Sequence, residues 1–168
     1  MTYRVEALGA GHVVDAFDCG NTPSNDWLKR HARGATGQGT RTYVLVDGAT
    51  GDVVGYFALA PHLVEREVTP VRVGRGAPRQ IHAILLAKLA LDRRVRGKGL
   101  GAEQLVRALE RIVEVAKQAG GKLVVVDAVD DRAAAFYEHH DFERLDGDPL
   151  RLVLKISSVA KALGMDRP

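Results

Sequence analysis

A glycine-rich turn lies between an apolar segment and a periodic helix, and it limits the folds that are open to this chain. The apolar segment occupies residues 84–91, and the turn follows it as Arg94-Val95-Arg96-Gly97-Lys98-Gly99-Leu100-Gly101. Glycine allows the backbone to bend tightly and to approach a ligand closely. The N–H groups exposed in such a turn, together with the positive end of the helix dipole, attract anions. Because the turn also carries three cations, it is predicted to hold a phosphate group.

Two familiar phosphate-binding motifs do not fit this turn. The P-loop requires G-x-x-x-x-G-K-[ST], and the turn has neither that spacing nor the hydroxyl residue. The dinucleotide fingerprint requires G-x-G-x-x-G, whereas the glycines here are spaced G-x-G-x-G. An ordinary turn before a helix is the simplest alternative, but three glycines and three cations exceed what a turn needs.

Composition places the chain among single-domain globular proteins. Its 168 residues and 46% apolar content suit one hydrophobic core, so we expect a single domain over residues 1–168. No apolar run is long enough to span a membrane, and the N-terminus lacks the pattern of a signal peptide. The single cysteine, Cys19, excludes an internal disulfide and suits a packed side chain better than a nucleophile. These features predict a cytoplasmic protein without membrane contact.

The charges are unevenly distributed along the chain, although the net charge is only +3. Residues 65–98 contain nine Arg or Lys against three acids, and residues 123–150 contain eight acids against two Arg. A basic segment of this kind favours contact with a polyanion. The basic residues before the glycine-rich turn exceed what a phosphate ligand there requires, and an ordinary solvated loop is the alternative interpretation.

Hydrophobic periodicity predicts an α/β chain. The expected strands lie at residues 3–8, 40–46, 53–63, 81–91, 123–126, 142–145 and 150–156. Helices are expected at residues 25–36, from the glycine-rich turn to residue 120, around residue 137, and at residues 157–163. Residues 11–20 are expected to form a short helix or turn, and residues 65–80 a basic loop. The mostly apolar strand at 81–91 should lie centrally, with the strand at 123–126 parallel to it.

Local signals refine two of these helices. Trp27, Leu28 and His31 recur at helical spacing and are expected on the inward face of the helix at residues 25–36. Asp130 is expected to cap the helix around residue 137, because a carboxylate at that position accepts hydrogen bonds from the unpaired N–H groups of the first turn.

Two motifs at a suitable separation resemble those of the GNAT family of N-acetyltransferases. Arg94-x-x-Gly97-x-Gly99 resembles the pyrophosphate motif Q/R-x-x-G-x-G/A, and residues 133–142 resemble the helix A-x-x-F-Y-E-x-x-G-F. Asp141 stands where that helix usually has glycine. The order of expected elements extends the resemblance to nearly the whole chain. It implies the α/β GNAT fold, a mixed central sheet with splayed parallel strands flanked by helices.

The resemblance also implies how acetyl-CoA binds. Pantetheine would pair with the backbone of Leu89, Ala90 and Leu91 as an added strand does. The pyrophosphate would meet the turn, at Arg94, Arg96, Gly97, Lys98, Gly99, Leu100 and Gly101. A backbone N–H near Ala90 would hold the oxyanion of the transition state. No metal is expected.

Tyr137 is the residue that the resemblance implies as the proton donor to the departing thiolate. A phenol with a pKa of about 10 is protonated at neutral pH and can donate without further adjustment. The alternative is a core residue whose hydroxyl finds an internal partner. The general base stays open among nearby candidates in the sequence: His62, Glu65, Glu67, His82 and Asp130. An α-amino group with a pKa of about 8 is partly neutral already and needs no dedicated base.

A narrower resemblance is to the acetyltransferase toxins of type II toxin–antitoxin systems. Phe17-Asp18-Cys19-Gly20 followed by Trp27-Leu28 is similar to the opening motif of that group, and the similarity continues to about residue 156. It implies that the substrate is the α-amino group of an aminoacyl-tRNA, whose acetylation blocks translation. It also implies a ribbon-helix-helix antitoxin as partner, and a homodimer.

The surplus of basic residues fits a tRNA substrate physically, since cations contact phosphates without reading bases. The main candidates are Arg66, Arg72, Arg75 and Arg79, and further candidates are Arg30, Arg33 and Arg41. Arg41 has an equally simple interpretation as a structural residue of a hairpin. The sequence does not identify which aminoacyl-tRNA is selected.

Two other functions remain open at this point. One is a GNAT enzyme that acts on protein or small-molecule amines, with the acidic segment at residues 123–150 as a vestibule for a polyamine. The other is a non-catalytic module that binds acyl-CoA. A ribbon-helix-helix gene directly upstream would favour the toxin.

Overall fold

The computed structural model describes residues 2–166. Its strands are β1 (Tyr3–Ala7), β2 (Arg41–Asp47), β3 (Val53–Glu65), β4 (Gln80–Leu91), β5 (Leu123–Asp127), β6 (Glu143–Leu145) and β7 (Asp148–Lys155). Its α-helices are α1 (Thr22–Asp26), α2 (Ala32–Ala35), α3 (Val71–Gly74), α4 (Leu100–Ala119), α5 (Asp131–His139) and α6 (Ile156–Ala162). The expected strands are therefore confirmed to within a few residues at their ends.

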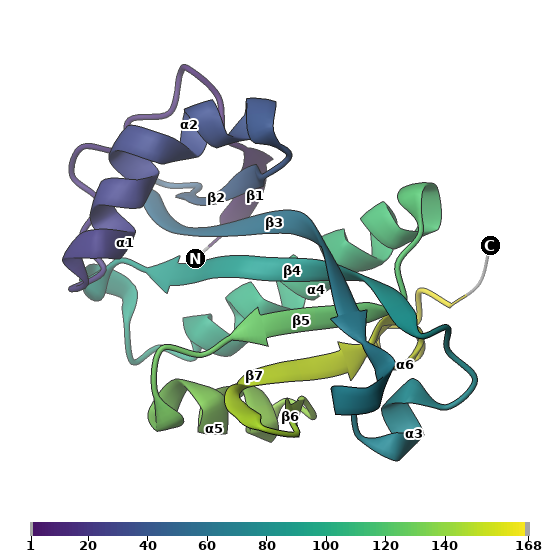
Figure 1. The fold of residues 1–168 in the computed structure, drawn as a ribbon. Helices are drawn as coiled ribbons and strands as arrows, with labels where there is room; N and C mark the ends of the chain where they lie inside the picture. Colours follow the sequence, from purple (N-terminus) through teal and green to yellow (C-terminus); the bar gives the residue numbers. More distant parts are fainter. Residues whose placement is uncertain (1, 167–168) are drawn as a thin grey trace. The chain divides into compact units, whose positions relative to one another are not determined.

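The strands form one mixed sheet in the order β1-β2-β3-β4-β5-β7-β6 (Figure 1). β4 pairs with β5 in parallel, from Ala83 opposite Leu123 to Leu86 opposite Val126, which confirms the predicted crossover. The pairs β1·β2, β2·β3, β5·β7 and β6·β7 are antiparallel. A mixed sheet with flanking helices is the predicted fold class.

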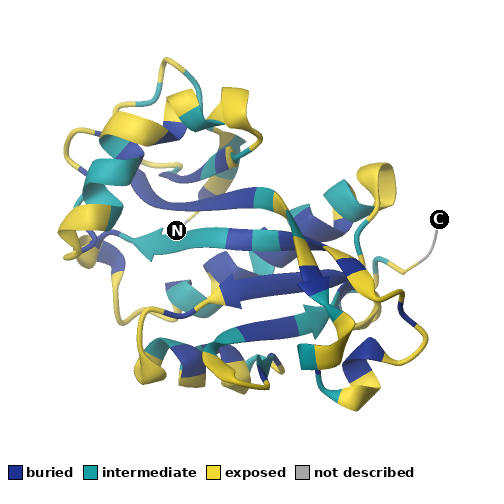
Figure 2. Ribbon diagram, in the orientation of Figure 1, coloured by how far each residue is buried: buried dark blue, intermediate teal, exposed yellow. Residues whose placement is uncertain are grey.

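The chain divides into two compact units, each with its own core. The first unit comprises Met1–Ala60 and Ala87–Ala108, and the second comprises Pro61–Leu86 and Leu109–Pro168. In the first unit Phe17, Leu28 and Val44 are buried together. In the second, Ile81, Leu123 and Val153 belong to one buried cluster, and β5 is buried along most of its length (Figure 2). β3, β4 and α4 each contribute residues to both units.

The helix predicted at residues 25–36 is interrupted in the structure. After α1, the segment Trp27–His31 is a π-helical turn, and α2 and a 3₁₀ turn at Thr36–Gln38 follow. The wider turn rotates the following residues relative to an uninterrupted α-helix. Leu28 and Ala32 are therefore the fully buried residues, and Trp27 is half-buried and stacked on Tyr56. The expectation that His31 lies on the inward face was wrong, since its side chain is exposed.

The predicted loops contain little regular structure. Residues 11–20 hold only turns, and residues 65–80 include a 3₁₀ turn at Arg66–Val68 and the single turn of α3. Asp130 caps α5 as predicted, because its Oδ1 accepts a hydrogen bond from the N–H of Ala133 at 2.8 Å.

Asp141 occupies the left-handed position that ends α5. Its φ is +73°, and it is the one residue other than glycine with a positive φ in the described part of the chain. The N–H of Asp141 donates to the carbonyl of Glu138, and the N–H of Phe142 donates to the carbonyl of Tyr137. This pattern closes a helix on a residue that is usually glycine. Asp141 therefore keeps the turn that glycine forms in the family motif, with added backbone strain.

We expect Asp141→Gly to raise the free energy of unfolding by about 0.5–1 kcal/mol, because glycine adopts this conformation without steric cost. Urea unfolding monitored by circular dichroism measures the change. Asp141→Ala is the matched control, which retains Cβ and should not gain stability. A glycine variant less stable than the parent would show that the carboxylate makes a compensating interaction.

Candidate active site

The glycine-rich turn is anchored to the first unit where β4 ends. The N–H of Asp92 donates to the carbonyl of Val54 on β3 at 2.8 Å, and a 3₁₀ turn at Arg93–Val95 follows. Val95 and Leu100 are buried in one cluster with Val54. Two apolar anchors therefore hold the turn on both sides of Gly97 and Gly99.

Asp92 organises this junction. Its side chain is only 2% exposed, and it accepts hydrogen bonds from the backbone N–H of Asp18 and of Arg94, each at 3.0 Å. The Nε of Arg94 donates to it as well, at 2.9 Å. Burial alone would raise the pKa of Asp92, but the hydrogen bonds and the charge of Arg94 hold the pKa below its usual value.

Two of the predicted phosphate-binding cations also have partners inside the protein. The guanidinium of Arg94 contacts Asp92, and its Nη1 lies 3.5 Å from Asp52. Arg96 donates a hydrogen bond to the carbonyl of Cys19. Both side chains therefore brace the turn, and their contact with phosphate stays a prediction. Lys98 is exposed and has no such partner among residues 2–166.

Gly97 and Gly99 leave open space beside the backbone. Their φ values are +77° and +72°, and no atom lies within 4 Å of where a Cβ would stand on either residue. The first N–H groups of α4 have no acceptor one turn earlier in the helix. An open turn, a helix N-terminus and the exposed Lys98 side chain form a cradle that suits a pyrophosphate.

The end of β4 contains a feature that the sequence did not reveal. The Nε2 of Gln104, a buried side chain on α4, donates to the carbonyls of Tyr56 and Ala90, both at 3.2 Å. A Cβ on Gly55 would stand 2.6 Å from this nitrogen, so only glycine fits there. In the sequence, this contact is marked only by a glutamine next to the apolar positions of α4. Its role cannot be inferred without knowing that Gly55 lies beside it.

The N–H and C=O groups of β4 do not alternate regularly between its two neighbouring strands. The carbonyl of His82 accepts a hydrogen bond from the N–H of Lys122 before β5, whereas the N–H of Asp92 faces β3. Residues separated by an even number point to the same edge in a regular strand. An irregularity therefore lies between them, of the kind that a β-bulge produces. Counting back from Asp92, the polar groups of Leu91 face away from β3 and are suited to pair with an extended ligand.

Tyr137 lies on α5 in the second unit. Its side chain is 9% exposed and packs edge-on against Phe136 and Phe142, with ring centroids 5.3 and 5.4 Å away. Burial raises the pKa of Tyr137 to about 12, so the phenol is protonated at neutral pH. No group in the described chain forms a hydrogen bond with its hydroxyl. The proton is therefore available for donation, as a catalytic acid requires.

None of the candidate general bases is clearly suited to that role. The Nη1 of Arg151 lies 2.8 Å from the Nε2 of His62. Because a guanidinium only donates, this nitrogen accepts and its lone pair is engaged. Burial and the charge of Arg151 lower the pKa of His62. Asp130 is engaged as a helix cap and Glu65 accepts a hydrogen bond from Gln80, while His82 and Glu67 are exposed.

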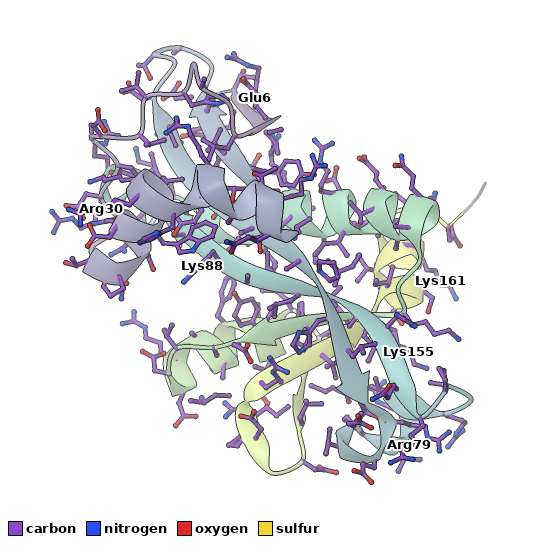
Figure 3. The ribbon with its side chains drawn as sticks, turned by 45° about the horizontal axis from the view of Figure 1, so that its top comes forward. Glu6, Arg30, Arg79, Lys88, Lys155 and Lys161 are labelled. Carbon is purple, nitrogen blue, oxygen red and sulfur yellow. The ribbon has the colours of Figure 1, made fainter. Side chains whose placement is uncertain are left out.

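The predicted tRNA-binding arginines fall into two groups. Arg66 donates to the carbonyl of Ala77 at 2.8 Å, and the Nε of Arg72 donates to Glu143 at 2.9 Å. Arg41, Arg75 and Arg79 are exposed, and their guanidinium groups have no partner within residues 2–166. Figure 3 shows Arg79 beside the start of β4. Arg41 belongs to the first unit and the other four arginines to the second.

Two further properties of residues 2–166 concern metal ions and membranes. They contain no group of three or more His, Cys, Asp or Glu side chains placed to hold a metal ion. No helix among them is long and apolar enough to span a membrane. Cys19 is buried, and its thiol donates weakly to the carbonyl of Asn21 at 3.6 Å.

Comparison with known proteins identifies the class of enzyme. Residues 38–144 match the family described as Acetyltransferase (GNAT) domain, and the chain belongs to this family of acetyltransferases. It is 38% identical over 152 residues to the tRNA-acetylating toxin of Mycobacterium tuberculosis (strain ATCC 25618 / H37Rv), covering 90% of each chain.

Two solved structures narrow the relationship. The toxin AtaT complexed with acetyl-methionyl-tRNAfMet is 25% identical with a TM-score of 0.87, covering 96% of this chain and 99% of that one. A tyrosine-to-phenylalanine variant of AtaT, bound to acetyl-CoA and the C-terminus of the antitoxin AtaR, is 25% identical with a TM-score of 0.81. That match covers 96% of this chain and 98% of the other. The predicted family, enzyme class and acetyl-CoA cofactor are thereby confirmed.

The importance of Asp92 to the junction is testable through stability. We expect Asp92→Asn to lower the free energy of unfolding by about 2 kcal/mol at pH 7, because a buried, charge-assisted network is lost. In the parent, a lowered folded pKa contributes stability above the unfolded value of about 3.9. This contribution disappears as the pH falls through the folded pKa.

Urea unfolding at a series of pH values measures this effect. The gap between parent and variant should narrow below about pH 4. Asp52→Asn is the control, since that carboxylate is half-exposed and its ion pair with Arg94 is worth at most about 1 kcal/mol. Equal stabilities of parent and Asp92→Asn at neutral pH would contradict the role assigned to Asp92.

Proposed function

We propose that this chain is the toxin of a type II toxin–antitoxin system that acetylates the α-amino group of aminoacyl-tRNA and so blocks translation. The observation that carries the proposal is the combination of the open glycine-rich cradle with a protonated, unpartnered Tyr137, in a chain closely related to a tRNA-acetylating toxin.

The residues of the first unit would bind the cofactor. Acetyl-CoA supplies an activated acetyl thioester when bound. The N–H groups from Gly97 to Gly101 would hold its pyrophosphate, with Lys98 adding positive charge. The backbone of β4 at Leu89–Leu91 would pair with its pantetheine arm, and Leu91 presents its polar groups to the required edge.

The proposed catalytic acid is Tyr137. Its hydroxyl would donate a proton to the departing sulfur, and burial keeps the proton in place until then. A backbone N–H near Ala90 would stabilise the charge that develops on the carbonyl oxygen. The α-amino group of an aminoacyl ester needs no dedicated base in this scheme, because a fraction of it is neutral at pH 7.

The proposed contact with tRNA uses the arginines that have no internal partner. Arg75, Arg79 and Arg41 offer guanidinium groups to phosphate oxygens. Arg66 and Arg72 are less suited, because the loop and Glu143 already engage them. The arginines with internal hydrogen bonds therefore stabilise the basic loop, and those without such bonds are proposed to contact the tRNA.

The structure weakens the main support for a polyamine substrate. Arginine neutralises part of the acidic segment at residues 123–150: Asp127 pairs with Arg151, and Asp131 and Glu138 pair with Arg144. Glu143 pairs with Arg72, and Asp130 is a helix cap. A vestibule for a polycation would need free carboxylates.

The remaining parts of the proposal concern partners and location. We propose that the antitoxin is a ribbon-helix-helix protein whose C-terminal tail covers the toxin, that the toxin is a homodimer, and that it acts in the cytoplasm, where charged tRNA is found. The complex of AtaT with the C-terminus of AtaR supports a tail-mediated contact.

The direct test is incubation with labelled acetyl-CoA and total charged tRNA, followed by identification of the acetylated aminoacyl group. We expect label on the amino acid, released by mild alkali that cleaves the ester to tRNA. Label on the protein fraction or on polyamines, with none on charged tRNA, would overturn the proposal.

Tyr137→Phe should reduce the rate of acetyl transfer by at least about 100-fold, since a positioned acid contributes that much. The affinity for acetyl-CoA, measured by calorimetry, should stay within about twofold. Tyr56→Phe is the control: it loses the hydrogen bond to the carbonyl of Ser24, at a cost in stability, but keeps turnover. A Tyr137→Phe protein with normal turnover would exclude the proton donor.

Binding of tRNA should weaken by more than about tenfold when salt rises from about 50 to 200 mM, because bound cations displace counterions from several phosphates. Arg75→Ala and Arg79→Ala should each lower the slope of log affinity against log salt by about one. Arg72→Ala should change it less, since Glu143 already pairs with that arginine. Filter binding measures the slopes, and an affinity insensitive to salt would argue against a tRNA substrate.

A further inference from the structure

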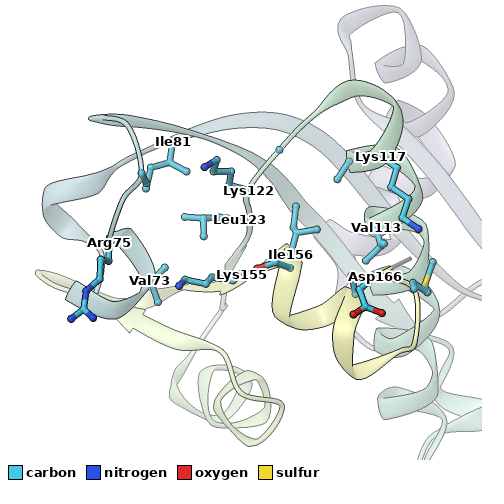
Figure 4. Close-up of a pocket in the computed structure, with 16 residues that line it drawn as sticks. Val73, Arg75, Ile81, Val113, Lys117, Lys122, Leu123, Lys155, Ile156 and Asp166 are labelled. Atoms are coloured by element: carbon cyan, nitrogen blue, oxygen red, sulfur yellow. The ribbon is translucent and has the colours of Figure 1, made fainter. Parts of the chain in front are cut away.

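The second unit contains a cavity whose lining shares Arg75 with the proposed tRNA contact and is otherwise separate from the residues assigned to the acetyltransferase site. Its volume is about 480 Å³, and it is lined by α3, the start of β4, α4, the turn before β5, and α6 (Figure 4). The floor is aliphatic and includes Ile81, Leu123 and Ile156, which are 0%, 1% and 6% exposed. The lining contains no aromatic ring. A volume of this size accommodates several apolar side chains.

Basic side chains surround this floor. Arg75, Lys122 and Lys155 line the cavity and lie toward one end of it in Figure 4. Lys117 lies at the other end, near Asp166, which is the one acidic residue that the described chain contributes to the lining. Within residues 2–166, no acidic side chain pairs with Arg75, Lys122 or Lys155. The cavity therefore presents three uncompensated positive charges beside an apolar surface.

The backbone holds two of these cations in place. The N–H of Lys122 donates to the carbonyl of His82 on β4 at 2.8 Å, and the carbonyl of Lys122 accepts from the N–H of Ile156 at 2.9 Å. Lys155 immediately precedes Ile156, so both lysines project from the same hydrogen-bonded corner. The backbone positions from which both lysine side chains start are therefore fixed before a ligand binds.

We propose that this cavity is a docking site for an acidic peptide segment of a partner protein. A leucine-like side chain of the segment fills the aliphatic floor, and its carboxylates pair with Arg75, Lys122 and Lys155. Arg75 lies apart from the corner that carries Lys122 and Lys155, so more than one carboxylate is needed to engage all three cations. This distribution favours a peptide over a fatty acid, which carries one carboxylate.

The same chemistry disfavours two other occupants. Single-stranded nucleic acid gains much of its affinity by stacking bases on aromatic rings, and this lining has none. A second copy of this chain would have to offer its acidic segment at residues 123–150. In that segment Asp127, Asp131, Glu138 and Glu143 already pair with arginine, which leaves at most half of its eight acids for such a contact.

The test is fluorescence anisotropy with a short fluorescein-labelled peptide of alternating glutamate and leucine, added to the full-length protein. We expect saturable binding that falls at least about tenfold in Lys122→Glu and in Lys155→Glu, because like charges then face the peptide. Lys161→Glu is the matched control on α6: that lysine is exposed, does not line the cavity, and makes the same change in net charge. Figure 3 labels both Lys155 and Lys161.

The apolar part of the site is tested separately. Ser157→Trp, at an exposed residue of the lining, should obstruct the cavity without changing its charge and should also weaken binding at least about tenfold. A peptide of alternating glutamate and serine should bind weakly to the parent. Thermal unfolding of each variant checks that the fold is retained.

Several outcomes would overturn the proposal. Equal binding of the glutamate–serine peptide, or an equal loss in Lys161→Glu, would mean non-specific attraction to a basic surface. Displacement of the peptide by laurate at similar affinity would assign the cavity to fatty acids. Displacement by a short single-stranded RNA, with RNA affinity lost in Lys122→Glu, would assign it to nucleic acid. Acetyl transfer is measured in parallel, and the docking site stands or falls independently of its result.

Discussion

The candidate cofactor site depends on the buried carboxylate of Asp92. It joins three parts of the first unit: the loop at Asp18, the end of β4 and the turn that begins at Arg94. Without that carboxylate, the N–H groups of Asp18 and Arg94 would lose their acceptor in the interior. The two glycines that follow can then keep their left-handed conformation with open space beside them, because the residues before them are fixed. Because the Asp92 carboxylate fixes the backbone before the turn, the space beside Gly97 and Gly99 stays open without side chains to support it.

The basic residues of this protein either hold its loops together or stay available to ligands, and the sequence alone does not distinguish the two groups. Arg66, Arg72, Arg94 and Arg96 hold loops and turns together through carbonyls and carboxylates. Lys98, Arg75, Arg79, Lys122 and Lys155 have no such partner in the described residues and are available to ligands. The ligands implied by their surroundings differ, since Lys98 stands beside an open helix N-terminus and Lys155 beside an aliphatic cavity. Burial and neighbouring groups, rather than charge alone, distinguish these sites.

Much of the fold was predictable from sequence because its signals are local. Alternation and apolar runs located the strands, and Asp130 marked the start of α5. The π-helical turn at Trp27–His31 was not predictable, because it depends on how Leu28 and Ala32 pack against the sheet. The same packing leaves the side chain of His31 exposed. The roles of Asp92 and Gln104 were also missed, since each depends on partners distant along the chain. The motifs located the turn and Tyr137, but pairing of Arg94 with Asp92 becomes visible only in three dimensions.

The close approach of Gln104 to Gly55 has a consequence for how this sequence can change. One side-chain amide satisfies carbonyls on two strands, and it fits only because position 55 has no Cβ. A larger residue at 55 displaces the amide from those carbonyls. A shorter residue at 104 removes the tightest of three contacts, but Leu91 Cδ2 at 3.0 Å and the carbonyl oxygen of Ala90 at 3.2 Å remain close to a new Cβ. The effects of the two substitutions are therefore non-additive. A side chain can be added at 55 only after Gln104 has been replaced, and Leu91 must then still shift by a few tenths of an ångström.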